Sequence, residues 1–116
     1  MKSRLPKNAG GASNMNSMIK QAQKMQDEIT TLQADIEARD FSATSGGGAV
    51  EVVVTGAKNI KSLTIKPEAI KDAVEDPEML QDLIVSAINA AMNDVETTTE
   101  DEMNKITGGV ALPGLF

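Results

Sequence analysis

Apolar and polar positions alternate with a period of two in one stretch of the chain, residues 46–67. Val50, Val52 and Val54 alternate with more polar neighbours, and a second run at residues 60–65 follows a turn-rich break at residues 56–59. Alternating β-branched residues are typical of a half-buried strand. Two such runs joined by four turn residues predict a hairpin that ends before Pro67, which cannot donate to a ladder.

A shorter alternation precedes this hairpin. Phe41 and Ala43 would fall on one side of an extended chain, with Ser42 and Thr44 on the other. The pattern predicts a third strand, which the glycines at residues 46–48 connect to the hairpin. A phosphate-binding loop is disfavoured at these glycines, because no Lys-Ser/Thr pair follows them and the next element is a strand.

Before residue 37 the apolar positions follow a helical period. Asn14 is the predicted N-cap. Spacings of three and four then alternate along one row, which we call the seam: Met15, Met18, Ala22, Met25, Ile29, Leu32 and Ile36. These spacings describe a heptad pattern of about three repeats. The seam is compatible with packing on the protein's own sheet and with packing on another helix, including one of a second subunit, and we expect both uses.

Two helices are predicted after the hairpin. Pro67 at a first helical position indicates a short helix to about residue 74. Asp76 as N-cap and Pro77 at N1 then begin a helix that no Gly or Pro interrupts until Gly108. Its apolar face is broad and comprises Leu80, Leu83, Ile84, Ala87, Ile88, Ala91, Met92 and Val95. Residues 96–102 contain no hydrophobic side chain, which predicts a solvated or projecting segment.

The apolar faces of the two long helices exceed what one small sheet can cover. We therefore expect a homodimer, with helical arms that extend from a β core. The apolar residues Leu112, Leu115 and Phe116 follow the last helix and are expected to pack, either within the chain or on a partner.

Composition excludes most catalytic chemistry. The 116-residue chain has no His and no Cys, so it lacks the usual nucleophile and base pair and the commonest transition-metal ligands. Carboxylate-only hydrolysis is compatible with the composition, but the acids occupy surface-type helical positions. We expect no enzyme activity, no cofactor, no metal site and no small-molecule substrate. No apolar run approaches the roughly 20 residues of a membrane span, so we expect a cytoplasmic protein without membrane contact.

Charge is distributed unevenly along the chain. The net charge is −6, of which residues 1–34 contribute +3 and the remainder −9. Residues 1–13 combine Pro6, Gly10 and Gly11 with basic side chains and no hydrophobic run, which predicts a flexible basic arm.

Four segments together resemble the YbaB/EbfC family of bacterial nucleoid-associated proteins. They are NMNSMIKQAQKMQDEI, SGGGAVEVVVTGAKNIKSLTI, DPEMLQDLIVSAINAAM and GGVALPGLF, and the resemblance covers residues 14–116 as a single domain. It implies an α+β fold with an N-terminal helix, a three-stranded antiparallel sheet, a short helix and a long C-terminal helix, assembled as a tweezers-like homodimer. It also implies a cytoplasmic protein of the nucleoid that binds duplex DNA and affects nucleoid organisation and gene expression.

The resemblance also implies candidate nucleic-acid-binding residues on the first helix. The segment MIKQAQKMQ matches the family's first-helix motif, which makes Lys20, Gln23 and Lys24 the candidates. All three lie off the seam on neighbouring helical rows, whereas Gln21 points in another direction and is a weaker candidate. The alternative for Lys20 and Lys24 is an ordinary solvated face, with Lys24 paired to Glu28 at i, i+4.

The chain departs from the family near the end of the last helix, where many members look basic. Here Glu100, Asp101 and Glu102 precede a single Lys105, and carboxylates repel the phosphate backbone. This departure supports an alternative function, an acidic homodimeric protein-interaction module without direct DNA contact.

Overall fold

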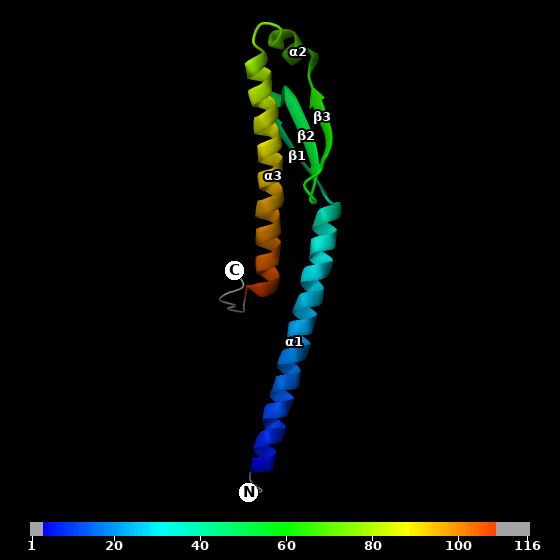
Figure 1. The fold of residues 1–116 in the computed structure, drawn as a ribbon, viewed down its shortest axis with the longest axis vertical. Coiled ribbons are helices and arrows are strands. Elements are labelled where there is room, and N and C mark those ends of the chain that lie inside the picture. Colours follow the sequence, from blue (N-terminus) through cyan, green and yellow to red (C-terminus); the bar gives the residue numbers. More distant parts are fainter. Residues whose placement is uncertain (1–3, 109–116) are drawn as a thin grey trace.

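The computed structural model describes the backbone of residues 4–108 and the side chains of residues 14–108. Its elements in chain order are helix α1 (Arg4–Ala38), strand β1 (Asp40–Ser45), the 3₁₀ turn η1 (Gly46–Gly48), strands β2 (Val50–Thr55) and β3 (Ile60–Ile65), and helices α2 (Pro67–Ala73) and α3 (Pro77–Thr107). Figure 1 shows α3 alongside the sheet and α1 extending away from it. The predicted α+β order is therefore confirmed.

The sheet is antiparallel, with β2 between β1 and β3. Val52 lies opposite Ala43 on one side and Leu63 on the other, so these three side chains share a face of the sheet. Helix α3 packs on this face, where buried valines of β2 meet small residues of the helix: Val50, Val52, Val54, Ala87, Ala91 and Val95. Full burial of one such valine contributes about 1.5–3 kcal/mol.

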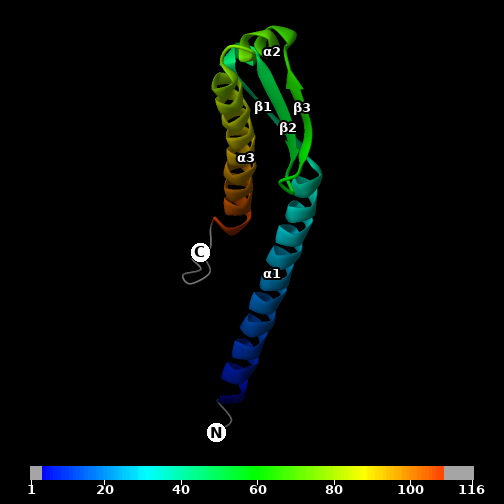
Figure 2. The same cartoon turned by 45° about the horizontal axis from the view of Figure 1, so that its top comes forward.

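Helix α3 lies over β1 and β2 and leaves β3 at an open edge. In both ribbon views β3 is the strand farthest from α3 (Figures 1 and 2). Leu63 and Ile60 on β3 are consequently 43% and 52% exposed, although Leu63 pairs with the fully buried Val52. Helix α3 thus covers the core face at β1 and β2 and leaves the same face partly exposed at β3.

Local signals set the turns and the start of α3. Gly46, Gly47 and Gly48 all have positive φ, between 60° and 94°, which favours glycine at each position. A Cβ on Gly46 would also lie 2.9 Å from the Leu83 side chain. The predicted Asp76 N-cap is confirmed, because its carboxylate accepts a hydrogen bond from the backbone N–H of Met79.

Helix α1 begins earlier than predicted. The helix runs from Arg4 to Ala38 and Asn14 lies inside it, so the N-cap prediction at Asn14 is wrong. The helix therefore includes residues 4–13, while the flexibility expected of residues 1–13 stays a prediction. With 35 residues, α1 is about 52 Å long at 1.5 Å per residue, and it accounts for much of the 88 Å length of the molecule.

We predict that Val52→Asp abolishes folding. Val52 is fully buried at the centre of β2, so the substitution would place an unpaired carboxylate in an aliphatic core. Circular dichroism and thermal melting test this, with Ser42→Asp on the exposed face of β1 as the matched control. A Val52→Asp variant with native-like helicity and melting would show that the core lies elsewhere.

Candidate nucleic-acid interface

Helix α1 is an arm that starts beside the sheet and passes the end of α3. Near Ala38 it lies next to the β2–β3 turn, it then follows the last turns of α3, and its N-terminal part continues beyond them (Figures 1 and 2). The largest tertiary contact of α1 is with α3. The helical neighbour of the seam within the chain is therefore α3, while Ile36 at the end of the seam lies against Gly56 at the edge of the sheet.

A close backbone contact fixes the base of this arm. The N–H of Gly56, just after β2, donates to the carbonyl of Arg39 at 3.0 Å. A Cβ on Gly56 would overlap the carbonyl oxygen of Ile36, and Ile36 is itself only 3% exposed. Glycine is needed at position 56 because the end of α1 lies directly against the strand.

Arg39 joins the arm to α3 through a charged fork. Its Nη1 and Nη2 donate to the two carboxylate oxygens of Glu102 at 2.6 and 2.9 Å, and Nη2 also donates to Asp35 at 2.8 Å. Bidentate pairing of this kind is stronger and more directional than a single contact. The hydrogen bonds from Arg39 lower the pKa of Glu102 and the pKa of Asp35, and those carboxylates raise the pKa of Arg39.

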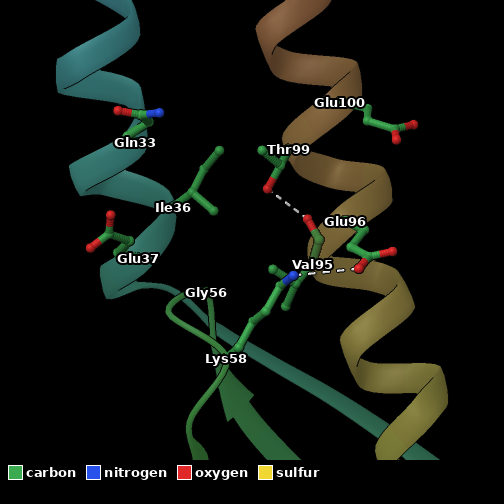
Figure 3. A pocket seen from close by; sticks show the side chains of 9 residues that line it. All are labelled: Gln33, Ile36, Glu37, Gly56, Lys58, Val95, Glu96, Thr99 and Glu100. Atoms are coloured by element: carbon green, nitrogen blue, oxygen red, sulfur yellow. Dashed lines mark hydrogen bonds and ion pairs between the residues drawn. The ribbon is translucent and has the colours of Figure 1, made fainter.

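A cavity of about 340 Å³ opens between α1, the β2–β3 turn and α3 (Figure 3). Its lining includes Glu37, Glu96 and Glu100, with Lys58 as the one basic side chain, and Lys58 pairs with Glu96 at 3.4 Å. This surplus of carboxylates makes the cavity a poor place for a phosphate. Among the described residues, no cluster of three or more acidic side chains is placed to hold a metal ion.

The structure brings the three predicted nucleic-acid-binding residues onto one surface. Lys20, Gln23 and Lys24 are exposed on α1, and the 100° rotation per residue sets them on the side opposite Ala22 and Met25 of the seam. Gln21 is exposed as well, on a row between the two sides. No ion pair joins Lys24 to Glu28 among the described side chains, but Lys24 lines a cavity with the carboxylates of Asp27, Glu28 and Asp35, which makes its surroundings less favourable to an anion than a free lysine would be.

The acidic segment of α3 is solvated but does not project. Glu96, Thr97, Glu100 and Asp101 are exposed, whereas Thr98 and Thr99 are half-buried beside the base of α1, so of the two predicted alternatives the solvated segment holds and the projecting one is wrong. Glu96 and Glu102 are neutralised by Lys58 and Arg39 of the same chain. Reasoning from the sequence did not single out Arg39 or Lys58, because nothing local to either residue indicates a partner 63 or 38 residues away.

Comparison with known proteins shows which family this chain belongs to. The sequence model of the YbaB/EbfC DNA-binding family matches residues 10–110. This chain belongs to the YbaB/EbfC DNA-binding family. The resemblance seen in the four sequence segments is confirmed, and the match extends a few residues into the predicted basic arm.

Individual YbaB/EbfC relatives agree with the family match. The chain is similar to a nucleoid-associated protein of Clostridium kluyveri, 49% identical over 109 residues and covering 94% of each chain. A nucleoid-associated protein of Alkaliphilus metalliredigens is 50% identical over 107 residues, covering 92% of each chain. Among solved structures, the uncharacterized protein HP0035 from Helicobacter pylori matches with a TM-score of 0.61 and 25% identity, over 73% of this chain and 87% of that one.

No helix in the described part of this YbaB/EbfC chain is long and apolar enough to cross a membrane. That observation agrees with the sequence, in which charged residues interrupt every helical segment.

The Arg39 fork predicts a pH-dependent stability. Glu102 and Asp35 titrate below their ordinary pKa values of 4.5 and 3.8 when folded, so the unfolded chain binds more protons in that range. The fork therefore stabilises the fold fully above those ordinary values, and the stabilisation is lost as pH falls through the lowered pKa values. Glu102→Gln should melt below the parent at pH 7, and the difference should vanish in acid.

Thermal melting across pH values from about 7 to about 2 measures this difference. Glu100→Gln is the matched control, since Glu100 forms no ion pair with a described side chain. An equal and pH-independent effect of the two substitutions would contradict a stabilising role for the fork.

Proposed function

We propose that this YbaB/EbfC protein is a nucleoid-associated protein that binds duplex DNA through the α1 arm. The observation that carries the proposal is the exposed row of Lys20, Gln23 and Lys24 on a helix that passes the end of the acidic body. The family match and the names of the relatives support DNA as the partner. Binding would depend on the phosphate backbone more than on base sequence, with Gln23 as the candidate for a base contact.

A net charge of −6 opposes binding to DNA, but the length of the arm separates its lysines from the acids near the end of α3. Glu100 and Asp101, the exposed acids nearest the end of α3, lie next to Glu102 and hence near Arg39 at the base of α1. Lys24 and Lys20 are 15 and 19 residues from Arg39, or about 22 and 28 Å along the helix. Those separations exceed two Debye lengths at physiological salt, where the length is about 8 Å. The acidic body is therefore largely screened from DNA bound at the arm.

The proposal includes a homodimer, for which the open edge of the core provides the surface. Leu63 and Ile60 on β3 and Val85 on α3 are 43%, 52% and 56% exposed in the single chain. Val85 shares a helical row with Glu96, and Glu96 pairs with Lys58, so the C-terminal end of this row of α3 lies beside the β2–β3 turn. A second copy placed against β3 and this row would bury the three side chains and present two α1 arms to DNA.

The names of the relatives support a cytoplasmic location on the nucleoid. Two arms on one dimer would contact a duplex at two places, which is a geometry suited to organising DNA. An effect on nucleoid organisation and gene expression would follow from occupancy of many such sites.

The second candidate function is an acidic homodimeric module that binds proteins without direct DNA contact. The charge of −9 beyond residue 34 favours it. The two functions differ in their response to salt. Direct phosphate contact predicts a steep loss of DNA affinity as salt rises, whereas an indirect association does not follow the counterion-release slope.

We predict that Lys20→Ala combined with Lys24→Ala weakens duplex binding equally on unrelated sequences. The slope of log K against log salt should fall by about 0.9 for each phosphate that a lysine no longer neutralises. Folding should survive, because neither side chain lies on the seam. Removing residues 1–13 should weaken binding further by taking away Lys2, Arg4 and Lys7, and Glu100→Lys should strengthen binding most clearly at low salt.

Gel-shift titrations at several salt concentrations measure these effects. Lys66→Ala with Lys71→Ala is the matched control, because it removes two exposed lysines from the α2 end of the molecule. If Lys20→Ala with Lys24→Ala binds as the parent does and Glu100→Lys changes nothing, the interaction-module function replaces DNA binding through α1.

We also predict that Leu63→Asp converts the dimer to a folded monomer. Leu63 lies on the uncovered part of the core face, so a carboxylate there would be buried only when a second copy docks. Sedimentation at micromolar concentration measures the mass, and Ser62→Asp on the opposite face of β3 is the control. A parent protein that sediments as a stable folded monomer would refute the dimer.

A further inference from the structure

The side chains of the seam are buried along the part of α1 that α3 covers, and they become exposed beyond the end of α3. Ile36 is 3% exposed, Leu32 and Ile29 are half-buried, and Met18 and Met15 are 67% and 65% exposed. The same heptad pattern runs through all of these positions, so the pattern does not explain the change. The presence or absence of α3 explains the change, because α3 ends at Thr107 beside the half of α1 nearer the sheet (Figure 1).

The point where α3 stops lies at a groove on α1. Ile106, in the last turn of α3, lines a cavity of about 480 Å³ with Leu32 and Thr31 of α1, and the charged side chains of Lys24, Asp27, Glu28 and Asp35 line the flank of this cavity away from the seam. Gly108 follows two residues later as the C-cap of α3. The chain therefore leaves α3 next to the place where the seam loses its cover.

The sequence that follows is apolar and carries no charged side chain. Residues 109–116 read GVALPGLF, with Val110, Leu112, Leu115 and Phe116 as the large apolar side chains. Eight residues span at most about 26 Å when extended. The distance along α1 from Ile29 to Met15 is 14 residues, or about 21 Å. The segment is thus long enough to cover the seam as far as Met18.

We propose that residues 110–116 pack on the seam of α1 in the same chain and continue the cover that α3 provides to Ile36 and Leu32. Their apolar side chains occupy the row of Met25, Ala22 and Met18, whose unbranched methionines adapt to an irregular extended partner. Lys20 and Gln23 stay free, because they project from the other side of α1. One side of the arm then packs on the chain's own apolar segment while the other side is left for DNA.

Attachment to α3 favours this intrachain contact over the same contact from a second copy. A segment tethered at Gly108, beside the groove, meets the seam at a high effective concentration, of millimolar order for a short flexible connection. A second copy has a separate apolar surface available at Leu63, Ile60 and Val85. The inference therefore does not depend on the proposed DNA binding or on the dimer.

Disulfide trapping tests the contact directly, since the chain contains no Cys. We expect Ala22→Cys with Leu115→Cys to oxidise to an intrachain disulfide, identified by a faster-migrating monomer on a non-reducing gel and by peptide mapping. The matched control is Lys20→Cys with Leu115→Cys, which places the first thiol two residues away and about 160° around the helix. The seam pair should form the intrachain bond at least about tenfold faster than the control pair, because a disulfide needs Cα atoms within about 7 Å.

Equal rates for the two pairs, or no intrachain product from the seam pair, would overturn the proposal. Covalent dimers as the main product would overturn it as well and would assign the seam to a second copy. Methyl NMR provides a readout that needs no new thiol. Phe116→Ala should shift the methyl resonances of Met18 and Met25, which would no longer feel the ring current of Phe116, and should leave Met79 near α2 unchanged. A Met18 and Met25 spectrum identical to that of the parent would contradict the proposal.

Discussion

Burial of the β2 valine row beneath the alanines of α3 is the contact on which the rest of the molecule depends. Val50, Val52 and Val54 are fully enclosed, and Ala87 and Ala91 let the helix lie close to the strand. Because α3 covers only two of the three strands, the same contact leaves Ile60 and Leu63 of β3 partly exposed. The stable core and the open surfaces are therefore two results of one packing arrangement.

The separation of charge between arm and body explains how an acidic chain can belong to a DNA-binding family. Arg39 and Lys58 pair with Glu102 and Glu96 at the base of the arm, which neutralises carboxylates where α1 and α3 meet. Lys20 and Lys24 lie along the arm, away from that cluster. Net charge alone is a poor guide here, since the position of each charge relative to the screening length decides what DNA would meet.

Elements with local signals could be predicted from the sequence, and contacts between distant segments could not. The valine alternation indicated the strands, and Asp76 with Pro77 indicated the start of α3, because each signal lies within the element that it sets. The early start of α1 was missed, since Pro6, Gly10 and Gly11 are typical of irregular chain. The Arg39 fork was missed because its partner lies 63 residues away. The family resemblance, confirmed by the comparisons, pointed to Lys20, Gln23 and Lys24, and their role stays a prediction.

The part of α1 beyond the end of α3 has the mechanics of a lever. Lys20 lies 12 residues, or about 18 Å, beyond Leu32, where α1 still meets α3, so a rotation of about 10° at that point moves the backbone of Lys20 by about 3 Å. Successive phosphates on one DNA strand are separated by about 3.4 Å along the helix axis. A small change in tilt would therefore move the lysine by about the spacing of one nucleotide. If the arm binds DNA as proposed, such a displacement is compatible with contacts to phosphates, which repeat along the duplex, more than with a rigid contact to one base pair.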